Sequence, residues 1–198
     1  MGDIPHFYFD LASPLAYLAA EQVRHALPAD TEWHPVLERE LPGGIGGPAG
    51  VFRCQNEQDI CVVEIERRAL ALGLQPMRWP PGFPFDSEPA MRVATYAKSI
   101  GRGVAFAQAA FRQAFAAGHD LANLDFVLIA AAACEMHPRA VLQSIERTPV
   151  QAELRSATEL AISCGVQTVP AVRVDGRVFE GEQQLQQAAI HATSVRKP

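Results

Sequence analysis

The sequence contains four cysteines but no Cys-x-x-Cys pair. A redox centre that cycles two thiols at that spacing is therefore excluded. Cys54, Cys61, Cys134 and Cys164 also lack the spacing to a histidine pair that zinc sites show, so we expect no bound metal. Because the chain shows no secretion signal, we expect all four to be structural thiols.

Targeting segments, long apolar runs and basic runs are missing as well. The longest apolar run, from Phe126 to Cys134, is about half of what a membrane span requires. The net charge is -5, from 22 acidic and 17 basic residues, which does not favour a nucleic-acid or membrane-surface partner. We expect a cytoplasmic protein with neither kind of partner.

The chain is long enough and apolar enough to bury a substantial core, with 198 residues of which 48% are hydrophobic. No internal repeat is present. Two stretches rich in helix-breaking residues divide the chain. Residues Pro42 to Gly50 hold five glycines and two prolines and predict a loop, and Trp79 to Pro84 form the second such cluster.

The opening of the chain predicts a strand, a helix and a second strand. His6 to Phe9 is a short apolar run that ends at Asp10. Ser13 followed by Pro14 is typical of a helix start, with serine as the N-cap and proline in the first turn. The second strand is expected over Thr31 to Val36.

A run of helices without strands follows. Ser87 is expected to cap one of them, and Asn123 or Asp125 to start another. The predicted helices cover Gln58 to Leu72, Glu88 to Ile100, Gly103 to Ala117, a segment ending at Cys134, and Pro138 to Glu146.

The last part returns to mixed structure. A helix over Pro149 to Cys164 precedes a strand over Val169 to Val174. Asp175-Gly176 then predicts a hairpin to a strand over Arg177 to Glu180, and a helix over Gln183 to Ala192 closes the chain.

This order predicts an α/β protein, a thioredoxin fold with an inserted all-helical domain, as in DsbA-like proteins. The thioredoxin-like domain comprises residues 1–42 and 149–198, and the helical insertion comprises 43–148.

Ser13 occupies the position at which this fold presents its reactive group. The first strand-to-helix turn lies at a helix N-terminus, where unpaired N–H groups and the helix dipole stabilise an anion. Here the tetrapeptide is Ser13-Pro14-Leu15-Ala16, which has no thiol. Ser13 alone could equally be a plain helix cap.

Val169-Pro170 favours the functional interpretation. In thioredoxin folds a cis-proline before the third strand packs beside the reactive turn, and the residue before it offers its backbone to a thiol-bearing peptide. Pro170 could otherwise be an ordinary edge-strand proline. Because Ser13 and Pro170 fit the fold from opposite ends of the chain, we predict that both belong to one site.

At these residues the chain resembles 2-hydroxychromene-2-carboxylate isomerases and kappa-class glutathione transferases, over nearly its whole length. The segments that carry the resemblance are Phe9 to Leu18, Glu64 to Leu74, Phe83 to Ser87 with Ala90 and Arg92, Gly118 to Leu121, and Gly165 to Gly181. The first and last are fairly specific in combination, whereas the middle ones are weak alone.

The resemblance implies bound glutathione whose thiolate is stabilised by Ser13 and whose backbone pairs with Val169 beside Pro170. It also implies a cis-trans isomerase that acts on an intermediate of aromatic degradation. The thiolate adds to a conjugated double bond, the bond rotates, and elimination returns glutathione. No residue in the sequence is an obvious general base.

The chain departs from the family where an Asp-Arg pair usually holds the γ-glutamyl end of glutathione. Here the segment runs through Glu182, Gln183 and Gln184, and its amides lose the charge pairing. Asn56 or Arg53 are candidates to replace other family residues in the stretch 43–60.

An aromatic-substrate pocket is expected from Tyr17, Trp79, Phe83 and Phe85, together with Asp86, where the family often has asparagine. Trp33 is a further candidate, although pockets and cores use the same residue types. Cys164 lies close enough in sequence to Pro170 to be near the site, or is a small buried hydrophobe.

Other functions stay open at this point. A kappa-like glutathione transferase would use the same thiolate site, and a non-redox binding protein that has lost glutathione recognition would explain Gln183 and Gln184. A disulfide oxidoreductase is disfavoured because neither Ser13 nor Ala16 is a cysteine. By analogy with the fold, we expect a homodimer.

Overall fold

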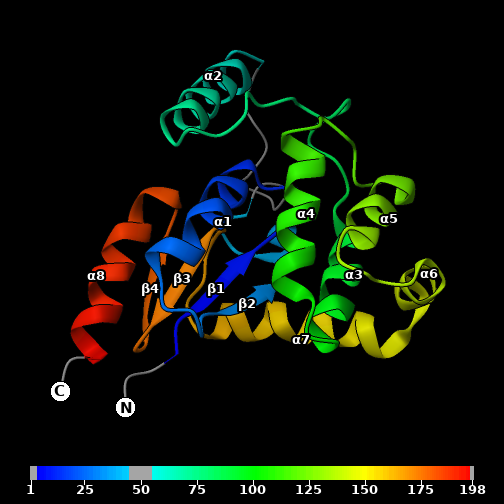
Figure 1. The fold of residues 1–198 in the computed structure, drawn as a ribbon. Helices are drawn as coiled ribbons and strands as arrows, with labels where there is room; N and C mark the ends of the chain where they lie inside the picture. Colours follow the sequence, from blue (N-terminus) through cyan, green and yellow to red (C-terminus); the bar gives the residue numbers. More distant parts are fainter. Residues whose placement is uncertain (1–3, 45–54, 197–198) are drawn as a thin grey trace.

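A computed structural model describes residues 4–44 and 55–196, with only the backbone described for residues 55–60. Its centre is a four-stranded sheet in the order β2-β1-β3-β4 (Figure 1). The strands are β1 (His6–Phe9), β2 (Glu32–Pro35), β3 (Ala171–Val174) and β4 (Arg177–Glu180). β2 runs parallel to β1, and β3 runs antiparallel to both β1 and β4.

The sheet separates two apolar layers because successive side chains of a strand point to opposite faces. Phe7 and Phe9 of β1 join the larger buried cluster together with α1 (Pro14–Ala26) and α8 (Leu185–Arg196). Tyr8 joins a smaller cluster with Ala161 of α7 (Thr148–Ser163). Helices therefore cover both faces of the sheet (Figure 1).

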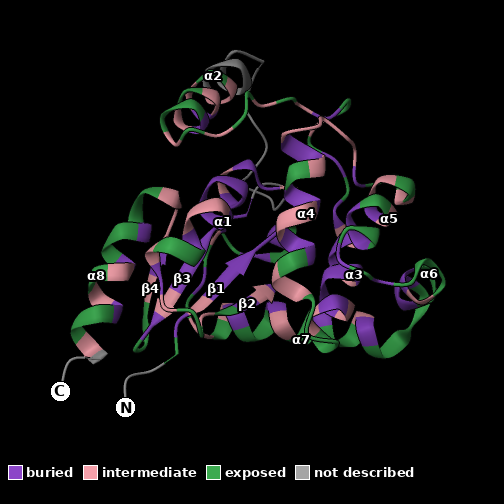
Figure 2. Cartoon of the chain, in the orientation of Figure 1, coloured by how far each residue is buried: buried purple, intermediate pink, exposed green. Residues whose placement is uncertain are grey.

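The helical segment between β2 and α7 shares its core with the sheet. Phe111 is fully buried and lies 5.8 Å from Phe9 and 6.2 Å from Tyr17, measured between ring centroids. The inner faces of the helices are buried and their outer faces exposed (Figure 2). The elements are η1 (Glu38–Glu40), α2 (Gln55–Ala71), α3 (Glu88–Ser99), α4 (Gly103–Phe115), α5 (Leu124–Ala132) and α6 (Pro138–Glu146).

The predicted element order is confirmed, with corrections at the boundaries. Ser87 precedes α3 as expected, but its side chain makes no cap; Asp86 Oδ1 accepts from the Glu88 backbone N–H instead, at 3.1 Å. The last helix begins at Leu185, because residues Glu182–Gln184 form a separate 3-10 turn, η2. The Asp175-Gly176 hairpin is confirmed, with positive φ at both residues, as a type I′ turn requires.

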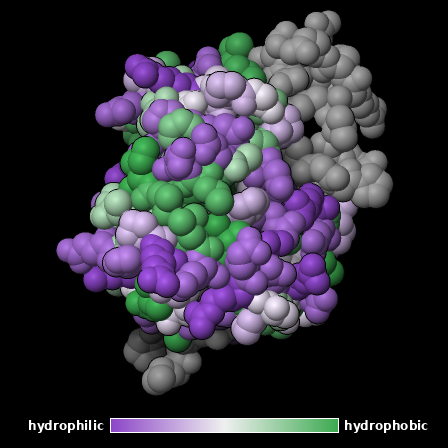
Figure 3. Space-filling model, turned by 90° about the vertical axis from the view of Figure 1, so that its right-hand side faces the viewer, coloured by the Kyte–Doolittle hydropathy of each residue, from purple (hydrophilic) through white to green (hydrophobic). Residues whose placement is uncertain are grey.

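Parts of the loop predicted over Pro42 to Gly50, with Arg53 and Cys54, lie outside the described residues. Cys61, Cys134 and Cys164 are free thiols. Within the described ranges, no helix has both the length and the apolar character needed to cross a bilayer. An apolar area lies on the side formed by α5 and α6 (Figure 3), where Ile129 and Leu142 are exposed.

A polar chain connects the starts of β1 and β2 to α3. His6 Nδ1 and His34 Nε2 are 2.9 Å apart, and Glu32 Oε2 is 3.3 Å from His34 Nε2. Such a triangle has the dimensions of a metal site, but Lys98 Nζ lies 2.9 Å from His34 Nδ1. Because an ammonium only donates, neutral His34 carries its proton on Nε2 and donates it to His6. His6, His34 and Lys98 therefore form a hydrogen-bonded chain, with Glu32 beside it.

We expect Phe111→Ala to lower the free energy of unfolding by about 3–5 kcal/mol, because a fully buried ring would leave a cavity between α4, β1 and α1. Urea unfolding followed by circular dichroism measures the loss. Since the sheet and the helical segment share this core, one transition is expected. Two separate transitions, with only one of them shifted, would contradict a shared core.

His34 makes folding sensitive to acid. Burial, followed by the charges of Lys98 and His6, lowers the pKa of His34 to about 3. Between that value and the ordinary pKa of about 6.5, the unfolded chain binds a proton that the folded chain does not. Stability therefore falls as the pH drops through this window, by up to about 1.4 kcal/mol per pH unit. Urea unfolding between pH 3 and 7 should show a shallower pH dependence for His34→Gln. Replacing the exposed His25 with glutamine should leave the dependence unchanged.

Candidate active site

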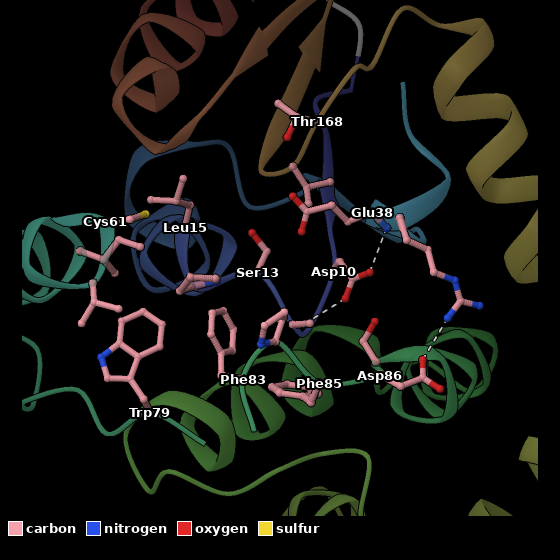
Figure 4. A pocket seen from close by; sticks show the side chains of 18 residues that line it. Asp10, Ser13, Leu15, Glu38, Cys61, Trp79, Phe83, Phe85, Asp86 and Thr168 are labelled. Atoms are coloured by element: carbon pink, nitrogen blue, oxygen red, sulfur yellow. Dashed lines mark hydrogen bonds and ion pairs between the residues drawn. The ribbon is translucent and has the colours of Figure 1, made fainter. Parts of the chain in front are cut away.

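A pocket of about 370 Å³ lies where β1 and β2 end, between the start of α1, α2 and the segment before α3 (Figure 4). It brings together the beginning, middle and end of the chain. Its described lining consists of Asp10, Ala12, Ser13, Pro14, Leu15, Glu38, Arg39, Cys61, Val62, Ile65, Trp79, Phe83, Pro84, Phe85, Asp86, Ser87, Thr168 and Val169.

Ser13 lies in this pocket at the N-terminus of α1, as predicted. Its side-chain oxygen accepts from the Ala16 N–H at 3.4 Å, and Pro14 occupies the first turn. The residue is only 2% exposed. A hydroxyl donor and the positive end of a 13-residue helix thus meet at one point, which is a suitable environment for an anion.

Val169 reaches the same pocket from the other end of the chain. The Val169–Pro170 peptide bond is cis, as the resemblance implied. Glu180 of β4 fixes the backbone just before this bond, because its carboxylate accepts from the N–H groups of Gln167 and Thr168. Pro170 is anchored in turn, with its carbonyl accepting from Gly181 N–H at 2.8 Å.

Trp79, Phe83 and Phe85 form the aromatic wall that the sequence predicted. Trp79 and Phe83 meet edge to face with ring centroids 5.0 Å apart, and Phe83 contacts Phe85 in the same way at 6.4 Å. The Trp79 indole N–H donates to Glu66 at 2.8 Å, which fixes the ring from outside the pocket. The wall is therefore apolar toward the cavity (Figure 4).

Two aromatic residues belong to the core instead, and the prediction that Tyr17 lines the substrate pocket is wrong. Tyr17 is 2% exposed and stacks on Phe115 at 5.7 Å, on the side of α1 away from the pocket. Trp33 packs against Phe7 and Phe9. Tyr17 lies one turn after Ser13 in α1, but the sequence alone could not show which neighbour that face meets.

Glu182, Gln183 and Gln184, which stand where the family holds the γ-glutamyl end of glutathione, do not line the described pocket. Glu182 accepts from Gln22 at 3.0 Å and lies 3.7 Å from Arg68 of α2. With its amide oxygen toward α2, Gln183 also accepts from Arg68, at 2.8 Å. This turn therefore joins α2 to the sheet domain.

Asp10 and Glu38 line the pocket beside Ser13, and sequence reasoning missed both. Asp10 accepts from the backbone N–H groups of Ala12 and Glu38, each at 2.9 Å, and from the Ser87 hydroxyl. Burial raises the pKa of Asp10, and these hydrogen bonds oppose that shift. A signal was present: both residues follow parallel neighbouring strands, whose carboxyl ends meet at one sheet edge.

Asp86 lines the pocket as predicted, and it is paired with a cation. Arg39 donates to Asp86 at 3.0 Å and also to Glu88, which in turn binds Arg92. This network joins the pocket residues Arg39 and Asp86 to α3.

Residues 6–191 match the family of DSBA-like thioredoxin domains. The chain belongs to this family.

Solved structures of DsbA-like proteins share the architecture over almost the entire chain. A 2-hydroxychromene-2-carboxylate isomerase superposes with a TM-score of 0.83 at 17% identity, covering 98% of this chain and 96% of the isomerase. A probable DsbA oxidoreductase from Streptomyces coelicolor gives 0.71 at 17% identity, with 98% and 91% covered.

The cytosolic disulfide reductase DsbM from Pseudomonas aeruginosa, in a structure with GSH, gives a TM-score of 0.65 at 16% identity, with 98% and 100% covered. A search of curated proteins found no match. These likenesses support the fold.

A thiol lies near the turn between β1 and α1 that carries Ser13, but it belongs to a different element. Cys61 of α2 lines the pocket, and its sulfur faces Leu15 (Figure 4). Burial raises the pKa of Cys61, while Arg68 partly opposes the shift. A raised pKa keeps the sulfur as a thiol, which is a poor nucleophile. Cys164 lies at the end of α7 and does not line the described pocket.

We expect Asp10→Asn to lower the free energy of unfolding by about 1–3 kcal/mol. Each carboxylate oxygen accepts from a different backbone N–H, so an amide would turn a donor toward one of them. Urea unfolding measures the loss. Asp120→Asn is the matched control. The Asp120 side chain accepts from the Ala122 backbone N–H through one oxygen, and an amide oxygen can keep that hydrogen bond. Equal effects of the two substitutions would contradict the bridging role of Asp10.

Proposed function

We propose that this chain is a glutathione-dependent cis-trans isomerase of the 2-hydroxychromene-2-carboxylate type, acting on an intermediate of aromatic degradation. The observation that carries the proposal is the meeting of Ser13 and Val169 in one pocket with an aromatic wall. The chemistry that glutathione would supply is reversible addition of its thiolate to a conjugated double bond, so that the bond can rotate.

Ser13 supports this reaction by position. Its hydroxyl can donate to an anionic sulfur, and the N–H groups of the first turn of α1 add their partial positive charge. Val169 precedes Pro170 and lines the pocket, where its backbone groups can pair with a peptide-like ligand. Trp79, Phe83 and Phe85 exclude water from the opposite side, where an aromatic ring would lie.

The γ-glutamyl end of glutathione requires a different assignment from the one the family suggests. Glu182 and Gln183 contact Arg68 and lie outside the described pocket lining. Arg68 is the cation of this region, and its side chain is 25% exposed. We assign the recognition of a glutathione carboxylate to Arg68, which lies one α2 turn beyond the pocket residue Ile65 and would exchange its ion pair with Glu64 for one with the ligand.

A kappa-like glutathione transferase is the second candidate, because it would use the same Ser13 site. Transfer would consume glutathione, whereas isomerisation returns it. A non-redox binding protein of this fold is the third candidate, favoured by the loss of the family's Asp-Arg pair at Gln183 and Gln184.

Calorimetric titration with reduced glutathione tests the proposal. We expect binding in the micromolar to low millimolar range. Ser13→Ala should weaken it about tenfold, as loss of one hydrogen bond to a charged group predicts. Ser99→Ala is the control, since Ser99 is exposed at the end of α3. The absence of any glutathione binding would rule out the isomerase and the transferase together.

If glutathione binds, turnover separates the candidates. Incubation with 2-hydroxychromene-2-carboxylate should give the trans-benzylidenepyruvate isomer with no net loss of free thiol. Stoichiometric loss of thiol would instead indicate a transferase.

A further inference from the structure

Arg39 is the one cationic side chain among the described residues that line the pocket, and it lies away from Trp79. Figure 4 shows Trp79 and Asp86 toward opposite ends of the pocket, with Ser13 between them. Arg39 belongs to the Asp86 end, because it donates to the Asp86 carboxylate at 3.0 Å. The pocket therefore has an aromatic end, an end with a cation, and Ser13 between the two.

Arg39 is held in position by partners that leave it able to bind a ligand. Its two terminal nitrogens donate to Asp86 and Glu88, and a guanidinium has more N–H groups than these two bonds use. The Arg39 side chain is 42% exposed and that of Asp86 58%. An ion pair exposed to this extent contributes up to about 1 kcal/mol, so an arriving carboxylate can exchange with Asp86. Glu88 is less exposed and keeps the guanidinium in place during the exchange.

The carboxylates around the cavity have partners of their own. Asp10 accepts from two backbone N–H groups and a hydroxyl, and burial raises its pKa. Glu38 also has an interaction partner. Glu88 is shared between Arg39 and Arg92, which adds a second guanidinium to this end of the pocket. A carboxylate that reaches Arg39 therefore enters a network that contains two cations.

A compound with an aromatic ring, a conjugated chain and a carboxylate in a row matches this arrangement. The ring would pack against Trp79 and Phe83, and the chain would cross the pocket beside Ser13. The carboxylate would reach Arg39, whose planar guanidinium can bind it through two parallel N–H bonds. With both ends fixed, the double bond lies next to a group bound at Ser13, which is the position that addition of a thiolate requires.

We propose that Arg39 binds the carboxylate of an aromatic acid whose ring and carboxylate are joined by a conjugated chain. Arg39 is thus a specificity-determining residue, which orients the substrate and takes no part in stabilising the thiolate. The inference deepens the proposed function and rests on it for the reaction. Recognition of the carboxylate itself involves no thiol, so it can be measured without glutathione.

Benzylidenepyruvate and benzylideneacetone are a matched pair of probes. They share the ring, the double bond and the ketone, and they differ in that one carries a carboxylate where the other has a methyl group. Calorimetric titration at neutral pH, where the acid is ionised, compares them in the absence of thiol. We expect the acid to bind about tenfold more tightly than the ketone, as one hydrogen-bonded contact with a charged group predicts. Equal affinities, or tighter binding of the ketone, would overturn the proposal.

Substitution of Arg39 identifies the source of the preference. Arg39→Gln should weaken binding of the acid about tenfold and that of the ketone less than about twofold. Arg39→Lys should restore part of the preference, because an ammonium keeps the charge but lacks the planar fork. Arg24→Gln is the matched control, since Arg24 is exposed on α1 and does not line the described pocket. If Arg39→Gln weakened both probes equally, Arg39 would have a structural role only, and the assignment would be wrong.

Asp86→Asn gives an independent test, which also serves if Arg39→Gln does not fold. It removes the charge that competes with the substrate for Arg39, while the asparagine oxygen can still accept from the Glu88 backbone N–H. The preference for the acid should rise about threefold. An unchanged or smaller preference in the folded variant would contradict the exchange at Arg39.

The result is separable from that of the glutathione titration. Isomerisation with glutathione, combined with no Arg39-dependent preference for the acid, would reject this inference and leave the proposed function intact. An Arg39-dependent preference in a chain that does not bind glutathione would support the carboxylate site and reject the isomerase.

Discussion

The buried carboxylate of Asp10 connects the parts of the chain that form the pocket. It binds the turn before α1 through Ala12, the segment after β2 through Glu38, and the segment before α3 through Ser87. Few side chains could replace it, because a carboxylate alone offers two oxygens that both accept. The position of Ser13 depends on this arrangement, since the Ser13 N–H also donates to the Asp10 carbonyl at 3.1 Å.

The same carboxylate imposes opposing electrostatic demands on the site. The N-terminus of α1 favours a negative charge near Ser13, whereas Asp10 and Glu38 disfavour one. The donors at the helix end act on a group bound directly at Ser13, while Asp10 and Glu38 line the cavity beside it.

The turn of Glu182 and Gln183 has a structural role. Its polar groups contact Arg68 and Gln22, and so connect α2 with α1 and the sheet. In the described structure these contacts support one wall of the pocket from outside. The division of the chain into residues 1–42 with 149–198, and 43–148, stays a prediction, while Phe9, Tyr17 and Phe111 show that the two ranges share one core.

Local sequence determined the helices and strands, and it identified Ser13 and Val169-Pro170 as parts of one site. Ser13-Pro14 specifies a helix start, Asp175-Gly176 specifies a tight hairpin, and the order of strands and helices limits the topology. Tertiary structure decided the rest. Tyr17 was expected in the pocket, yet its helical face meets Phe115. Glu38 carried no motif, and it joined the site only because parallel strands bring their carboxyl ends together. Periodicity records which residues share a face, but the neighbour that each face meets depends on contacts between segments far apart in the chain.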